Sequence, residues 1–254
     1  MYHYNNKFLF VVGFLLFSSA LQAEEIHIGT GTHSLGVLAD ISRLFEKQYP
    51  NDKVIVHRDN YTTALLYKQI KEKNDIDLVL LIGMEMVTQL ETEGLSLPKG
   101  HFNYALGKLV LWSKNPNLVD NKGEVLKTDR FQKIGILDPK VAIYGATAQQ
   151  TLEKLEVWET IQPKLVLMNN ALELQQHVLD GSIDMTFIPL VTLNPSKKIE
   201  GSLWIIPKGY YSPIEHQIVL LKRAENNTAA KRFFEYLKSS QARNIFEKHG
   251  FSVP

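Results

Sequence analysis

Short apolar runs alternate with amphipathic stretches along most of this chain. The run at 77–82 (DLVLLI) is continuously apolar, which is typical of a parallel strand buried on both faces. The stretch 34–49 instead repeats apolar residues at helical spacing. Strand and helix patterns alternate three times between residues 25 and 93, and this order predicts an open parallel sheet with helices on both faces. The expected strands are 25–29, 53–57 and 77–82, and the expected helices are 34–49, 62–72 and 84–93.

A second α/β unit follows. Its final element is a strongly amphipathic stretch, 229–247, which predicts one long helix with Gly250 as its stop. Other expected strands are 106–113, 133–137, 164–167, 183–188, 203–206 and 217–221, with helices at 149–155 and 171–179.

Two similar units without a flexible linker predict two lobes with a cleft between them. We expect an α/β protein in which each lobe is a mainly parallel sheet flanked by helices. The first lobe takes 24–105 and returns at 213–254, and the second lobe takes 106–212. The chain is expected to cross between the lobes near 105–109 and near 213–217.

The first 23 residues are expected to be a cleavable secretory signal. Lys7 is followed by the apolar run 8–17 and then by small residues. That run is about half of the ~20 residues that a membrane-spanning helix needs. Cleavage after Ala23 is preferred over cleavage after Ala20, and an uncleaved N-terminal anchor is the alternative. The mature protein is therefore expected in the periplasm.

Composition narrows the possible partners. Lys7 is the only charged residue of the signal, so the remainder balances 27 basic residues against 27 acidic ones. Such neutrality argues against a nucleic-acid partner. The chain has no cysteine, which excludes disulfides, thiol chemistry and a lipid anchor on cysteine.

The loop that opens the first helix is a candidate binding site. Gly29 and Gly31 allow close backbone approach, and Thr32, His33 and Ser34 offer polar groups at a helix N-terminus, where anions are favoured. Helix capping by Thr32 or Ser34 is the structural alternative.

A second helix start offers similar groups. Residues 59–63 (DNYTT) open the next helix, and topology places them on the same sheet edge as the first loop. Thr62 and Thr63 are the candidate ligands, and capping by Asn60 or Thr62 is the alternative.

The sequence carries no sign of catalysis or of metal binding. It lacks the common nucleophile, zinc and phosphate-loop motifs, and its eight histidines show no metal spacing. His27 and His57 lie on neighbouring predicted strands and are expected to approach each other, as ordinary histidines rather than as a metal pair. No catalytic residue, metal or cofactor is expected.

Two further segments suggest a family. The first is the ending F-x-x-Y-L…A-x-x-I-F-x-x-x-G-F, and the second runs from Asp138 to Leu165. Their residues are Phe233, Tyr236, Leu237, Ala242, Ile245, Phe246, Gly250 and Phe251, and Asp138, Pro139, Gly145, Ala148, Leu152, Leu155, Trp158, Pro163, Lys164 and Leu165. On these residues the chain resembles the periplasmic molybdate-binding proteins of ABC importers, which have the type II solute-binding fold.

The resemblance implies a ligand set of five positions. Two are hydroxyl side chains of the first lobe, which fall on His33 (beside Ser34) and Thr63. Two are backbone donors of the second lobe, which fall on Tyr144 and Ala171. The fifth is a tyrosine that falls on Pro189, which has neither a hydroxyl nor an N–H group.

His33, Tyr144 and Pro189 therefore depart from the family pattern, and the identity of the ligand stays open. The expected ligand-binding residues are Thr32, His33, Ser34, Thr62, Thr63, Tyr144 and Ala171.

The resemblance implies a monomer that carries molybdate, tungstate or a related oxyanion to an inner-membrane permease. One alternative is the same fold with another oxyanion or a small organic acid as ligand. A periplasmic sensor without a transport role is a second alternative. A third is a hydrolase that uses His33 and Asp59.

Overall fold

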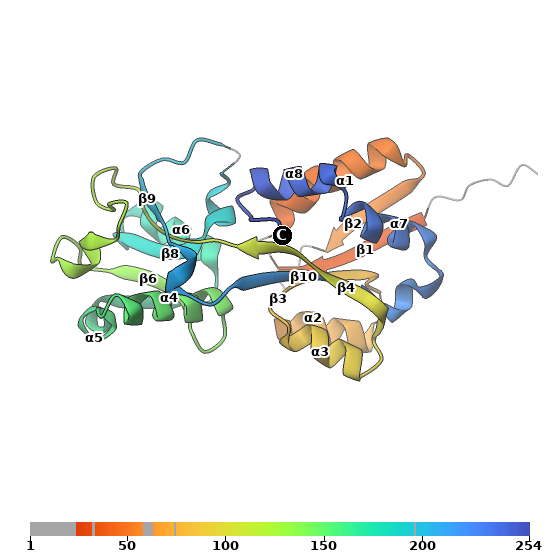
Figure 1. Ribbon diagram of the computed structural model, residues 1–254, viewed down its shortest axis with the longest axis horizontal. Helices are drawn as coiled ribbons and strands as arrows, with labels where there is room; N and C mark the ends of the chain where they lie inside the picture. The colour runs from red at the N-terminus through yellow and green to blue at the C-terminus, as the bar shows by residue number, and fades with distance from the viewer. Residues whose placement is uncertain (1–23, 32–33, 58–62, 74, 196) are drawn as a thin grey trace, which may run out of the picture.

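The computed structural model describes residues 24–31, 34–57, 63–73, 75–195 and 197–254. They form two lobes that lie side by side, with the C-terminus between them (Figure 1). Each lobe holds one five-stranded sheet. The proposed signal, residues 1–23, lies outside the described residues. No helix in the described ranges is long and apolar enough to cross a membrane.

The first sheet has the strand order β2-β1-β3-β10-β4. Strand β1 is parallel to β2 and β3, whereas β10 is antiparallel to β3 and β4. Helices α1, α7 and α8 lie on one side of this sheet, and α2 and α3 lie on the other (Figure 1). The strands are β1 (Glu24–Thr30), β2 (Asp52–His57), β3 (Leu78–Ile82), β4 (Ser96–Gly107) and β10 (Ile214–Leu221). The helices are α1 (Leu35–Gln48), α2 (Thr63–Glu72), α3 (Glu85–Thr92), α7 (Thr228–Tyr236) and α8 (Ser240–Lys248).

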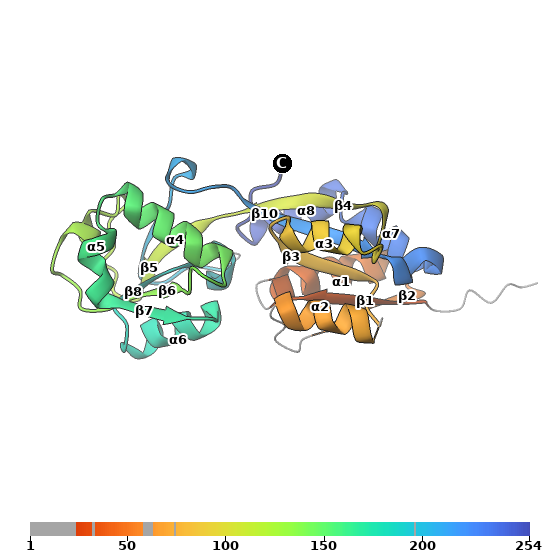
Figure 2. The ribbon, with the colours of Figure 1, turned by 90° about the horizontal axis from the view of Figure 1, so that it is seen from below.

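The second sheet repeats this arrangement with the order β7-β6-β8-β5-β9. Strand β6 is parallel to β7 and β8, and β5 is antiparallel to β8 and β9. Helices α4 and α6 lie on opposite sides of it (Figure 2). Its elements are β5 (Leu109–Ser113), β6 (Ile134–Leu137), α4 (Ile143–Lys154), α5 (Trp158–Ile161), β7 (Leu165–Met168), α6 (Ala171–Asp180), β8 (Met185–Pro189) and β9 (Ser202–Ile205). Short 3₁₀ helices include Glu124–Lys127, Gln162–Lys164, η4 (Leu190–Leu193), Lys208–Tyr210 and Lys222–Asn226.

The expectation of two lobes with mainly parallel sheets is confirmed, with one refinement. In each sheet the strands run in one direction except for a single reversed strand, β10 or β5. These reversed strands adjoin the crossings between the sheets. The chain leaves the first sheet at Lys108, between β4 and β5, and returns between Ile205 and Ile214.

Alternation along β1 explains how the first lobe builds its core. Ile26 and Ile28 are fully buried, and they pack in one cluster with Phe45 of α1 and Phe233 of α7. Each such side chain contributes about 1.5–3 kcal/mol on burial. His27, between the two isoleucines, points to the opposite face of the sheet because strand side chains alternate.

The expected single C-terminal helix is wrong, because two helices replace it. Leu237 ends α7, and the side chain of Ser239 caps α8 by accepting a hydrogen bond from the amide of Ala242 at 3.2 Å. Phe233 and Phe246 nevertheless pack in the same core. The apolar stripe therefore continues across a break in the backbone.

Two other expected elements have different limits. The strand expected at 106–113 is two strands separated at Lys108, and the first of them, β4, begins at Ser96. The helix expected at 149–155 begins at Ile143. Its N-cap, Ala142, has no side chain that can cap a helix, so the usual start signal is missing.

Candidate functional site

The starts of the first two helices share one edge of the first sheet. Strands β1 and β2 are parallel neighbours in which Gly29 pairs with His57, so both strands end at the same edge. This arrangement agrees with the expected topology. Thr32, His33 and Thr62 lie outside the described residues, and Thr63 is described only as the first residue of α2. Their role as ligands stays a prediction.

A cavity of about 180 Å³ lies between the two lobes. It faces the first turn of α1 and the end of α8 in the first lobe, and the start of α6 and η4 in the second lobe. No carboxylate is among its described lining residues, and such a wall suits an anion. The lining residues are Gly36, Ala171, Leu172, Val191, Thr192, Asn194 and His249.

Ala171, one of the predicted ligand residues, presents a helix N-terminus to this cavity. It is the first residue of α6, and the side chain of Asn170 caps the helix by accepting from the amide of Leu172 at 2.9 Å. The amide of Ala171 has no acceptor within its own helix, because the first-turn amides of any helix lack one. The N-terminal end of the helix dipole adds a further attraction for an anion.

Thr192 is a wall residue that sequence reasoning missed. Pro189 ends β8, and the chain then turns through η4, which places Thr192 on the cavity. Its hydroxyl is a donor three residues beyond the position that the resemblance assigns to a tyrosine. The only signal in the sequence is a hydroxyl residue shortly after a strand.

His249 and Asp40 form a hydrogen-bonded pair at the cavity wall. The imidazole Nε2 donates to Asp40 Oδ2 at 2.9 Å. This hydrogen bond lowers the pKa of the Asp40 carboxyl below its ordinary value, and neighbouring Arg43 lowers it further. His249 is almost buried, so the contact fixes the ring against α1. No local pattern in the sequence indicates a function for His249.

The start of α4 lies tightly against the end of β6. A Cβ atom at Gly145 would collide with the backbone of Leu137 and Asp138, so only glycine fits there. The amides of Ile143 and Tyr144 also lie in the first turn, where the helix offers them no acceptor. This second helix start of the second lobe therefore keeps donor capacity beside the carboxyl end of β6.

Ser34 and Tyr144, both predicted ligands, are buried and belong to one chain of polar contacts. Ser34 Oγ lies 3.4 Å from the Tyr104 hydroxyl, which lies 3.3 Å from His216 Nδ1. The other ring nitrogen, Nε2, lies 3.1 Å from the Tyr144 hydroxyl. Tyr104 and His216 lie on β4 and β10, the strands at the crossings. The hydroxyl of Tyr144 is thus directed toward the strands at the crossings, whereas its amide lies in the first turn of α4.

Tyr104 and Tyr144 contact the two different ring nitrogens of His216. Burial raises the pKa of both the Tyr104 and the Tyr144 hydroxyl, so both keep their protons near neutral pH. A neutral imidazole has one N–H group and one lone pair. With the His216 ring neutral, one of the two tyrosines donates to it and the other accepts from it.

Thr30 is another residue that the sequence reasoning passed over. It is the last residue of β1, and its buried hydroxyl has no hydrogen-bond partner among the described residues. It precedes the loop of Thr32 and His33.

The described residues contain no group of three or more His, Cys, Asp or Glu side chains arranged to hold a metal ion. The cavity wall described above supplies uncharged donors and one imidazole, which can bind and desolvate an anion. Asp59 and His33, the pair of the hydrolase alternative, lie outside the described residues.

Comparisons with known proteins agree with this geometry. The molybdate-binding protein ModA of Azotobacter vinelandii is 32% identical over 249 residues, which cover 98% of each chain. ModA of Rhodobacter capsulatus is 37% identical over 185 residues, which cover 73% of this chain and 72% of that protein.

A solved structure, the periplasmic molybdate-binding protein of Azotobacter vinelandii, superposes with a TM-score of 0.81 at 30% identity. The match covers 90% of this chain and 99% of that one. The family model described as bacterial extracellular solute-binding protein matches residues 26–252. The chain therefore belongs to the bacterial extracellular solute-binding protein family.

Proposed function

We propose that this protein is the periplasmic substrate-binding component of an ABC importer and that it binds molybdate or a closely related oxyanion between its lobes. The observation that carries the proposal is the interlobe cavity, whose described lining residues include Ala171, the first residue of α6, and no carboxylate. The names of the similar proteins from Azotobacter and Rhodobacter support the choice of ligand.

In the proposed cycle, the ligand enters while the lobes are apart and gives up its water to donors from both of them. Ala171 and Thr192 supply donors from the second lobe, and Thr32, His33, Thr62 and Thr63 supply them from the first. Since a buried dianion needs nearly complete hydrogen bonding, each missing donor costs about 1–3 kcal/mol. Closure by a hinge movement then produces the form that docks on a membrane permease. No reaction is carried out on the ligand, and the protein acts as a monomer.

A panel of ligands tests this proposal. A ligand present at 100 times its Kd adds about 2.7 kcal/mol to the free energy of unfolding, which raises Tm by about 5–10 °C in a chain of this size. We expect molybdate and tungstate to raise Tm by this amount, and sulfate, phosphate and small dicarboxylates to raise it less. A larger Tm shift with an organic acid would identify that acid as the ligand and would leave the role as a binding protein unchanged. Turnover of any compound in the panel would contradict the binding role itself.

A further inference from the structure

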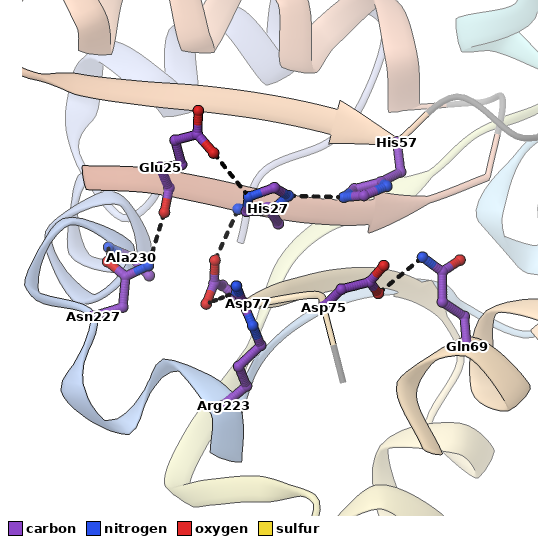
Figure 3. Close-up of polar contacts among 9 residues, drawn as sticks. All are labelled: Glu25, His27, His57, Gln69, Asp75, Asp77, Arg223, Asn227 and Ala230. Atoms are coloured by element: carbon purple, nitrogen blue, oxygen red, sulfur yellow. Dashed lines mark hydrogen bonds and ion pairs between the residues drawn. The ribbon is translucent and has the colours of Figure 1, made fainter. Parts of the chain in front are cut away.

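The face of the first sheet opposite α1 carries two partly exposed histidines in direct contact. His27 Nδ1 on β1 lies 3.1 Å from His57 Nε2 on β2, and the two rings are tilted by 41°. On the other side of His27, Nε2 lies 3.4 Å from a carboxylate oxygen of Glu25. Figure 3 shows these three side chains in a row along the sheet. The His27 side chain is 22% exposed and that of Glu25 is 60% exposed, so solvent reaches the group.

The backbone holds both histidines firmly. The amide of His27 donates to Asp77 Oδ2 at 2.9 Å, and the amide of Asp77 donates to the His27 carbonyl at 2.8 Å. Arg223 neutralises the Asp77 carboxylate (Figure 3). His57 is fixed by its pairing with Gly29. Groups placed on rigid strands lose little entropy when they bind a ligand.

The separation of the ring nitrogens matches two ligands of one metal ion. A tetrahedral Zn²⁺ ion bonds imidazole nitrogens at about 2.0–2.1 Å, which places two such nitrogens about 3.3–3.4 Å apart. To admit the ion, His27 and His57 need to separate by a few tenths of an ångström and to turn their facing ring nitrogens toward a common point. Histidines that bind metals usually donate their second ring N–H group to a carboxylate, as His27 can to Glu25.

We propose that His27 and His57 form a binding site for a divalent transition-metal ion such as Zn²⁺, with Glu25 as a positioning residue for His27. Two imidazoles leave the remaining coordination positions to water. Neither histidine is among the described residues that line the interlobe cavity. Imidazole ligands also select transition metals over Mg²⁺ and Ca²⁺, which prefer oxygen.

Calorimetric titration of the protein, prepared without a histidine tag, tests the site. We expect one Zn²⁺ ion per chain in the wild type and no binding of Mg²⁺. His27→Ala and His57→Ala should each weaken Zn²⁺ binding at least tenfold. The matched control is His101→Ala, since His101 is also a partly exposed histidine beside a carboxylate, Glu91, on another part of the lobe. It should leave the affinity unchanged.

A second measurement does not depend on variants. In NMR spectra of the wild type, Zn²⁺ should shift the imidazole resonances of His27 and His57 and leave those of His101 and His177 in place.

Glu25→Gln should weaken Zn²⁺ binding several-fold while both histidine ligands remain. Equal affinity in all histidine variants, or no heat at millimolar Zn²⁺, would overturn the proposal. Because the titrations contain no molybdate, this outcome is independent of the proposed transport role.

Discussion

The hydroxyl of Tyr144 lies 3.1 Å from Nε2 of His216, and this contact joins the second lobe to a strand of the first. Gly107, beside the crossing, makes the contact possible, because a Cβ atom there would overlap the tyrosine hydroxyl and the imidazole. Tyr144, in the first turn of α4, is therefore linked to β10, the strand by which the chain returns to the first lobe.

Tyr144→Phe tests the strength of this contact. The variant keeps the ring and removes the hydroxyl, which leaves a buried nitrogen of His216 without this partner. We expect the free energy of unfolding in urea to fall by about 1–3 kcal/mol. The matched control is Tyr67→Phe, whose exposed hydroxyl bonds Glu93 and which should change the stability by less than about 0.5 kcal/mol. Equal effects of the two variants would show that the hinge contact contributes no more than a surface contact.

Gly145→Ala tests the close packing of α4 on β6. The new methyl group meets the carbonyl of Leu137, so the helix start has to shift, at a cost of about 1–3 kcal/mol. Gly209→Ala is the control, since its Cβ would meet no atom within 4 Å. Thermal unfolding should show a lower Tm for the first variant and an unchanged or slightly higher Tm for the second. An unchanged Tm in Gly145→Ala would contradict the packing.

Asp40→Asn tests the contact between Asp40 and His249 at the cavity wall. The pKa of Asp40 is lower in the folded chain than in the unfolded one, chiefly through His249. Its contribution to stability is therefore present above the ordinary carboxyl pKa of about 3.9 and is lost as the pH falls through the lower folded value. Between pH 5 and pH 2.5, the Tm of the wild type should approach that of the variant. Parallel Tm curves over this range would rule out the linkage.

Ala171→Pro tests the amide donor with little disturbance of the fold. Proline is tolerated at the first position of a helix, and Asn170 already has the extended backbone (φ −133°, ψ 124°) that must precede a proline. The variant removes one N–H group, so molybdate binding should weaken about 5- to 150-fold while Tm of the ligand-free protein stays unchanged.

Ser240→Pro supplies the control for this substitution. Ser240 is the exposed first residue of α8, and the preceding Ser239 also has an extended backbone. The Ser240→Pro variant should bind molybdate with the same affinity as the wild type. An affinity of Ala171→Pro equal to that of Ser240→Pro would show that the Ala171 amide does not bind the ligand.

The sequence predicts the two-lobed architecture because its strongest signals are local. Apolar runs such as 77–82 and the periodic stretch of α1 identify elements without knowledge of their neighbours. A predicted boundary is wrong where tertiary packing continues the apolar pattern across a break in the backbone. The stripe from Phe233 to Phe246 continues because both helices pack on one core, although Ser239 marks the break.

The contacts of the site are less predictable because they join distant residues. Tyr144 and His216 are 72 positions apart, and Asp40 and His249 are 209 apart. No local pattern of polar residues shows such pairs. Thr192 was missed for a related reason, since only the turn after Pro189 brings it to the cavity. The His27–His57 contact could be expected because parallel neighbouring strands fix it.

Calorimetric titration of residues 24–254 with sodium molybdate tests directly whether the protein binds an oxyanion between its lobes. We expect heat with one molybdate bound per chain, saturation at submillimolar concentration, and weaker binding in Ala171→Pro than in Ser240→Pro. Absence of heat and of any Tm shift up to millimolar molybdate and tungstate would contradict it.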